Sequence, residues 1–212
     1  PWNQTVDSGP DADVPGWFYN LGISGLRAEL VEDDKRVLVV RHVFPGSPAS
    51  GKIEVGDLIA GAGGEPFTEP HRNGYGEEFF GGHGPVAEFA TALDACQSPD
   101  GNGQLELTVR RNRRVRDIVL DIGTEYGSYS PTFPADCAKS DKILDQLLPY
   151  LVENQGEEGS FGDAVHNTFA PLALLASGDA KYLAAVELNV RFHCRETRAD
   201  EDRRFGLINW DY

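Results

Sequence analysis

The chain has 212 residues, of which 40% are hydrophobic and 25% are charged, and this ordinary composition excludes a wholly disordered or collagen-like protein. Its 34 acidic and 19 basic residues give a formal net charge of −15, which opposes attraction to nucleic-acid phosphates and to anionic lipid. No apolar run approaches the roughly 18 residues that a membrane-spanning helix requires. We therefore expect no nucleic-acid partner and no membrane span.

The cysteines and the first residue indicate whether the chain is cross-linked and whether it is processed. Cys96, Cys137 and Cys194 lack the close spacing of a zinc site, and an odd number of cysteines cannot all pair internally. We therefore expect no disulfide framework. The sequence contains no Met and begins at Pro1, which indicates a processed or trimmed piece.

The first half of the sequence, up to about Gly123, is rich in Gly and contains short β-branched runs. Val37–Val40 and Leu105–Val109 are examples, and such runs between Pro and Gly predict strands joined by turns. One segment, Pro85–Cys96, instead has apolar residues at helical spacing, with Pro85 where the first turn of a helix tolerates proline. Five or six short strands with one amphipathic helix predict a small α+β barrel or sandwich. A hairpin over Gly103–Asp121 is its clearest element.

The second half has a different pattern. Residues 127–134 form a link rich in Gly, Ser, Pro and aromatic residues, and the β-branched runs stop after Cys137. Apolar residues then recur at helical spacing in three groups. The groups are Ile143, Leu147, Tyr150 and Leu151, then Val165, Phe169 and Leu172, then Leu183, Val186 and Val190. The pattern predicts an all-α segment of about three helices.

A fixed order of short motifs occupies Val37–Phe67. A strand is followed by Pro45–Ala49, which turns into a short helix, then by Val55–Ile59, which enters the next strand, and then by a turn centred on Gly64. This order resembles the PDZ family, especially the bacterial type found beside envelope proteases. The resemblance covers about residues 17–122 and implies a PDZ domain with one groove helix.

Two further segments match parts of a PDZ domain, and one departs from it. Asn20–Ile23 resembles the carboxylate-binding loop of the family, and Pro85–Cys96 stands where the family has its groove helix. The departure is Thr68–Gly84, an insertion with Gly and His that would cover or extend the groove. The predicted organisation is an N-terminal extension at 1–16, a PDZ domain at 17–123, a linker at 124–137 and a helical segment at 138–212.

The resemblance implies a site for an extended or C-terminal peptide. Such a peptide adds as a strand to a sheet edge, while backbone N–H groups of a Gly-containing loop receive its terminal carboxylate. The expected peptide-binding residues are Leu21, Gly22, Ile23, Val86, Phe89 and Leu93. The first three would donate N–H groups and the last three would form an apolar groove, so the expected ligand ends in an apolar residue. The alternative is that these apolar side chains are ordinary core.

The helical half carries a second resemblance. Gln155–Asp163 leads into a helix, and Gly178-Asp179 leads into another, which resembles one repeat of an α/α toroid of the terpene cyclase and prenyltransferase kind. A PDZ module followed by such repeats also resembles an uncharacterised bacterial family in which His166-Asn167-Thr168 and Gly206–Trp210 belong to recurring patterns. Helical repeats cannot bury their faces alone, and a closed toroid needs many more than three helices. We expect either a longer protein or a partner that covers this segment.

Candidate catalytic groups have simpler explanations. His166 beside Asp163 could form an acid–base pair, but Asp163 is better placed to cap the helix that follows. His71 and His83 share one insertion with acidic residues and could chelate a metal, although a solvated loop is the preferred interpretation. No nucleophile elbow and no phosphate-binding loop occur. We expect no catalytic residue, no metal and no cofactor in this chain.

The preferred hypothesis is a non-catalytic protein–protein interaction module. Its PDZ domain would capture a peptide, or it would pack as a subunit of a larger assembly. The alternative is that the chain is the N-terminal part of a toroid enzyme whose active site lies outside it. PDZ modules of the resembled type work in the bacterial envelope, so the resemblance implies a periplasmic or extracellular location. Ligand sequence, organism and oligomeric state do not follow from the sequence.

Overall fold

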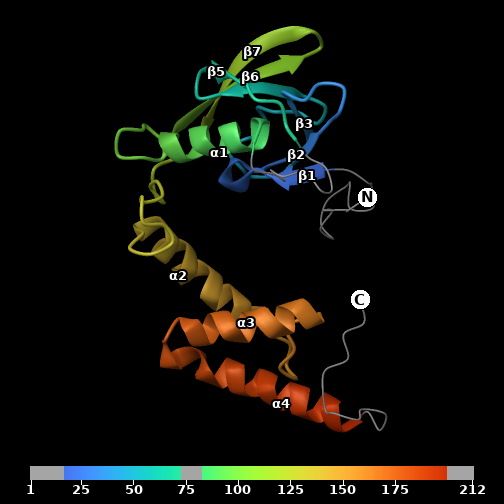
Figure 1. Ribbon diagram of the computed structural model, residues 1–212, viewed down its shortest axis with the longest axis vertical. Coiled ribbons are helices and arrows are strands. Elements are labelled where there is room, and N and C mark those ends of the chain that lie inside the picture. The colour runs from blue at the N-terminus through green and yellow to red at the C-terminus, as the bar shows by residue number, and fades with distance from the viewer. Residues whose placement is uncertain (1–16, 73–82, 200–212) are drawn as a thin grey trace. The chain divides into compact units, whose positions relative to one another are not determined.

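The computed structural model describes residues 17–72 and 83–199 (Figure 1). This part of the chain is α+β, with seven strands in one antiparallel sheet and four α-helices. The chain divides into two compact units between Lys139 and Ser140. The α+β class and the helical second half are thereby confirmed. The expected extension at 1–16 and the pattern Gly206–Trp210 lie outside the described residues.

Of the described elements, the first unit contains the seven strands and the helix α1. In chain order its elements are β1 (Trp17–Asn20), a 3-10 turn η1 (Gly22–Ser24), β2 (Leu26–Leu30), β3 (Leu38–Val43), β4 (Leu58–Ala62), β5 (Glu65–Pro66), α1 (Pro85–Cys96), β6 (Gln104–Arg111) and β7 (Arg114–Asp121). The strands are hydrogen-bonded in the order β1-β2-β3-β4-β6-β7, and β5 pairs with β4. All of these pairs are antiparallel. The sheet therefore ends at β1 and at β7.

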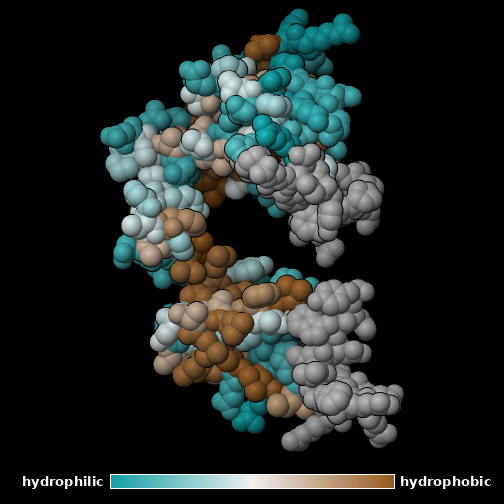
Figure 2. Space-filling model, viewed as in Figure 1, coloured by the Kyte–Doolittle hydropathy of each residue, from teal (hydrophilic) through white to brown (hydrophobic). Residues whose placement is uncertain are grey.

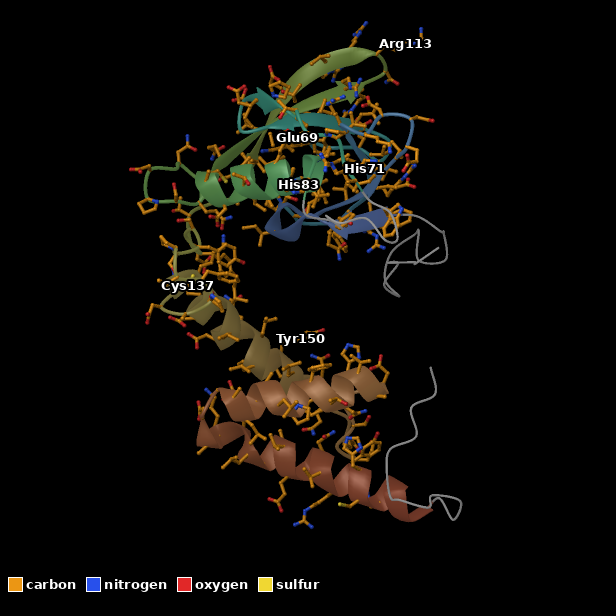
Figure 3. All side chains as sticks on the ribbon, in the orientation of Figure 1. Glu69, His71, His83, Arg113, Cys137 and Tyr150 are labelled. Atoms are coloured by element: carbon orange, nitrogen blue, oxygen red, sulfur yellow. The ribbon has the colours of Figure 1, made fainter. Side chains whose placement is uncertain are left out.

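The hairpin β6–β7 is tighter than its sequence indicates. Arg111 pairs with Arg114, so Asn112 and Arg113 alone form the turn, and both have positive φ, 51° and 64°. Two consecutive residues of this kind are typical of a type I′ turn, whose twist matches that of the flanking strands. The exposed Arg113 at its tip is labelled in Figure 3.

Alternate residues of the strands make the core of the first unit, and α1 packs on it through β4 and β6. Leu105, Leu107 and Val109 of β6 are fully buried, as their period of two requires. Phe89 of α1 is 1% exposed and lies in the same cluster. The helix is thus fixed to the sheet by its own apolar face.

A charged network joins the end of β6 to the loop before β4. The guanidinium of Arg111 donates to both carboxylate oxygens of Asp57, at 2.7 and 2.6 Å, and to Glu54 Oε1 at 2.5 Å. Asp57 is only 2% exposed. Burial alone raises the pKa of the Asp57 carboxyl, but the hydrogen bonds from Arg111 and from the Glu54 backbone N–H outweigh it and hold the pKa below its usual range. Asp57 is therefore a buried, ionised part of the fold.

The second unit is helical, with α2 (Ala138–Glu153), α3 (Ala164–Ala176), a 3-10 turn η2 (Ala180–Tyr182) and α4 (Leu183–Ala199). Helices α3 and α4 pack together, as Figure 1 shows. The core of this unit is small. It consists of Leu148, Leu174, Tyr182, Ala185 and Val186, with Leu151, Val152 and Phe161 partly buried around them.

Buried amides fix the corner between α2 and α3. Asn167 Oδ1 accepts the Phe161 N–H at 2.7 Å and Asn189 Nδ2 at 2.9 Å, while Gln155 Nε2 donates to Gly159 O at 3.0 Å. A Cβ on Gly159 would lie 2.4 Å from the Leu188 carbonyl oxygen, so only glycine fits there. The polar loop Gln155–Asp163 therefore has a structural role, and each of these side-chain amides has hydrogen-bond partners.

Candidate functional site

The structure brings the predicted carboxylate-binding loop beside the predicted groove helix. A Cβ on Gly22 would lie 3.5 Å from Leu93 Cδ2, which places η1 against the C-terminal half of α1. Gly22 and Ile23 are exposed, Ile23 by 41%. Two parts of the sequence separated by about 70 residues therefore meet at one place, as the peptide-site hypothesis requires.

The backbone of this loop is partly used by the fold itself. The Leu21 N–H donates to Leu26 O at 2.8 Å, and the Leu21 carbonyl accepts Ser24 Oγ at 2.7 Å. Leu21 is also buried, so it belongs to the turn and the core. Within the described residues, the N–H groups of Gly22 and Ile23 have no acceptor. Gly22 and Ile23 are the donors that remain for an anionic ligand.

The predicted groove residues of α1 differ in exposure. Val86 and Leu93 are half-buried and lie at the border of the core, whereas Phe89 is fully buried within it. Phe89 anchors the helix to the core of the sheet, and its ring is not accessible to a ligand. Substitution of Phe89 would disturb the fold before it tested binding.

Strand β2 has no unpaired edge to offer a peptide. On one side it pairs with β3, and on the other with β1, where Trp17 is opposite Leu30 and Asn20 is opposite Arg27. The chain's own β1 runs antiparallel to β2 and ends just before the loop with Gly22. Phe18 of β1 is buried, so this strand is part of the core. Strand addition at this end of the sheet would have to use the outer edge of β1.

A cavity of about 460 Å³ lies on another face of α1, against β4 and β5. Its lining includes Glu88, Ala92 and Cys96 of α1 and Phe67 of the chain after β5. Glu88 is engaged there, because its Oε1 accepts both the N–H and the hydroxyl of Thr68, at 3.0 and 2.9 Å. Burial raises the pKa of the Cys96 thiol, so this cysteine is not an activated nucleophile.

Two of the histidines singled out in the sequence, His166 and His71, have defined contacts, and the ring Nδ1 of His166 lies 2.9 Å from Asp163 Oδ1. The His166 backbone N–H donates to Asp163 Oδ1 at 2.9 Å, which makes Asp163 the N-cap of α3. That hydrogen bond is the main reason why the pKa of Asp163 lies below its usual range. His71 is buried, with Nε2 2.9 Å from the Val31 carbonyl oxygen, and Figure 3 labels it with His83. Among the described residues, no group of three or more potential ligands gathers around a metal position.

Helix α3 is apolar on two opposite faces. It contains no Asp, Glu, Lys or Arg along its thirteen residues. One face, with Asn167, Ala170 and Leu174, is buried. The opposite face carries the group predicted from helical spacing, Val165, Phe169 and Leu172, which are 55%, 65% and 55% exposed. The spacing therefore identified a real face, and it is the uncovered one.

The apolar surface continues beyond α3. Exposed apolar residues of the other helices are Leu144, Leu147 and Tyr150 of α2 and Leu183 and Val190 of α4. Figure 2 shows hydrophobic residues gathered over the helical unit, and Figure 3 labels Tyr150 on α2. So many large apolar side chains exceed what a monomeric protein ordinarily leaves scattered on its surface, a pattern that is typical of interaction surfaces.

Comparison with known protein families and with curated proteins matches this chain to none of them. In the described parts of the chain, no helix is both long and apolar enough to cross a membrane. We therefore infer function from the surfaces themselves, because a fold alone does not specify an activity.

Proposed function

We propose that this chain is a non-catalytic protein–protein interaction protein whose helical unit packs into a larger helical layer. The observation that carries the proposal is α3, which lacks charged side chains and is buried on one face only. A helix that has no charged side chain and carries apolar residues on two opposite faces is typical of a position between two other layers. The outer layer is the partner or the further chain that we infer.

Energetics favour covering this face. Fully burying one Val, Leu or Phe side chain stabilises a protein by about 1.5–3 kcal/mol. Val165, Phe169 and Leu172 each retain more than half of their exposed surface, so covering all three contributes a few kcal/mol before association costs. The resemblance to an α/α toroid supports the same conclusion, because each toroid repeat needs neighbours. If those neighbours complete a toroid enzyme, its active site lies outside this chain.

The size of the protein in an extract of its own cells tests the proposal. We expect the unchanged chain to elute within a larger assembly and the double substitution Phe169→Ser with Leu172→Ser to elute at a smaller size. Val115→Ser in β7 is the matched control, because Val115 is 64% exposed and Phe169 is 65% exposed. The proposal is wrong if the double variant and the control elute alike.

A second candidate function is the capture of a peptide carboxylate by a PDZ domain. The observation in its favour is the exposed Gly22-Ile23 segment, with two available N–H donors beside Leu93. Since β1 fills the edge of β2, the peptide would pair along the outer edge of β1 with its C-terminus at Gly22.

A peptide with a free C-terminus and the same peptide with an amidated C-terminus distinguish this candidate. We expect an apolar-ended peptide to bind only with its carboxylate free, as measured by fluorescence anisotropy. Ile23→Pro should abolish that binding, because proline has no N–H to donate. Equal binding of the free and amidated peptides would remove the carboxylate site.

A further inference from the structure

The helical unit contains a cavity of about 450 Å³ between α2 and α3. Leu144 and Leu148 of α2, one turn apart, form its apolar wall, and Ala173 and Ala176 of α3 lie on the other side. Leu148 is buried in the core beneath, whereas Leu144 is half exposed. Small residues on one side allow the backbone of an incoming helix to approach closely, and leucines on the other side offer it apolar contact.

The charged residues that line this groove are all acidic. Asp141 and Asp145 lie along it, both exposed and one helical turn apart. Within the described chain neither carboxylate pairs with a cation. Like charges at this spacing repel each other. The C-terminal end of α3, near Ala176, adds partial negative charge from its last carbonyl groups.

These observations indicate which kind of partner fits the groove. An amphipathic helix with an apolar stripe fills the groove between the leucines and alanines, and Lys or Arg beside that stripe neutralises Asp141 and Asp145. A second copy of this chain fits less well. Residues 140–199 carry nine acidic and five basic side chains, and a symmetric contact through the groove would place carboxylates against carboxylates.

We propose that the groove between α2 and α3 receives a basic amphipathic helix of a partner protein, with two of its cations against Asp141 and Asp145. This inference rests on the proposed function and adds the chemistry of the partner. It also divides the apolar surface into two parts, because the groove is charged at its rim whereas the outer face of α3 is neutral.

A designed helical peptide tests the inference directly. The probe is a fluorescein-labelled, capped peptide of roughly 18 residues, long enough to be helical by itself. It has leucines at i, i+4 and i+7 with lysines beside them. Two companions carry Glu in place of the lysines, or Ser in place of the leucines. We expect the lysine peptide to bind the full chain, and both companions to bind at least tenfold more weakly at low salt.

Substitutions in the chain locate the binding. Asp141→Asn with Asp145→Asn should lower the affinity for the lysine peptide roughly two- to tenfold, the loss expected for two exposed ion pairs, and remove most of its salt dependence. Glu153→Gln with Glu157→Gln is the matched control, because it changes the same charge on exposed residues of the same unit outside the groove. Circular dichroism of each variant checks that its helices are intact.

Besides a failure of the lysine peptide to bind, three results would overturn the inference. These are equal binding of the lysine and glutamate peptides, binding unaffected by the two groove substitutions, and a concentration-dependent dimer that Leu144→Ser disrupts, since that would make a second copy the occupant. The proposed function is tested separately, by the elution size of the variants at Phe169 and Leu172. If the lysine peptide does not bind but substitution of Phe169 still reduces the size of the native assembly, the groove inference is wrong and the packing of α3 stands.

Discussion

Asp57 shows how one buried charge can be explained by its partners. The carboxylate is closed off from solvent, yet Arg111 and a backbone N–H hold it ionised. In the sequence, Asp57 lies inside the motif Val55–Ile59. Its partner lies 54 residues later, in a basic run that the sequence indicates only as an exposed turn. A long-range ion pair of this kind has no local signature, so Arg111 was not predicted.

A pH-dependent stability follows from this pair. The folded pKa of Asp57 is lowered, so its contribution is present above the unfolded value of about 3.9 and is lost as pH falls through the folded pKa. We expect Asp57→Asn to lower the free energy of unfolding by about 3 kcal/mol at pH 7, because Arg111 loses a buried partner. The difference between the two proteins should shrink below pH 4. Urea unfolding at both pH values measures it.

Asp34→Asn is the matched control for that prediction. Asp34 pairs with Arg110, the residue next to Arg111, at 2.7 Å, and the hydrogen bond from Arg110 likewise lowers the pKa of its carboxyl. Both side chains of this pair are about 40% exposed, so solvent screens the pair and the loss should stay under about 1 kcal/mol. Equal losses for Asp34→Asn and Asp57→Asn would contradict the assignment of a buried network.

The residues of the predicted peptide site show where local patterns stop being informative. The segment Asn20–Ile23 resembles a carboxylate-binding loop, and in the structure it leads into a 3-10 turn with Gly22 exposed. Which of its N–H groups are free depends on the hydrogen bond from Leu21 to Leu26, a property of the turn. The exposure of Val86, Phe89 and Leu93 depends on how α1 is oriented about its own axis when it packs on the sheet. Helical spacing finds that face but does not say how deeply each residue lies.

At the scale of elements, the sequence predicts long periodic segments well. The helix expected at Pro85–Cys96 has those bounds, and three α-helices lie between Cys137 and the end of the described residues. Strand pairing is harder to predict, because the partner of a strand is set by long-range register. The placement of β1 along β2 is such a case. It decides which edge a peptide could use, and nothing in the spacing of Trp17–Asn20 indicates it.

Helix α3 is the element whose pattern is most informative about function. Its apolar residues at helical spacing would ordinarily be assigned to the core of the unit. The structure buries Leu174 and Ala170 instead and leaves Phe169 and Leu172 outside. The clue in the sequence is the absence of any charged residue over Ala164–Ala176, because a helix at the edge of a protein normally has a charged outer face.

For the whole molecule, the two units differ in how much of their apolar surface each buries by itself. The α+β unit has a well-filled core around Phe89 and Leu107, whereas the helical unit has a small core and large exposed apolar side chains. The first unit therefore buries most of its large apolar side chains in its own core. The second buries too little of its apolar surface by itself, as one part of a repeating helical layer would.

The central claim is that the outer face of α3 is covered in the native protein. The most direct measurement places a photo-crosslinking amino acid at position 169, and at 115 as the control, in the protein within its own cells, and maps the crosslinked peptides by mass spectrometry. The account predicts crosslinks from position 169 to one defined helical segment and none from position 115. Crosslinks that are absent at 169, or equally scattered from both positions, would contradict it.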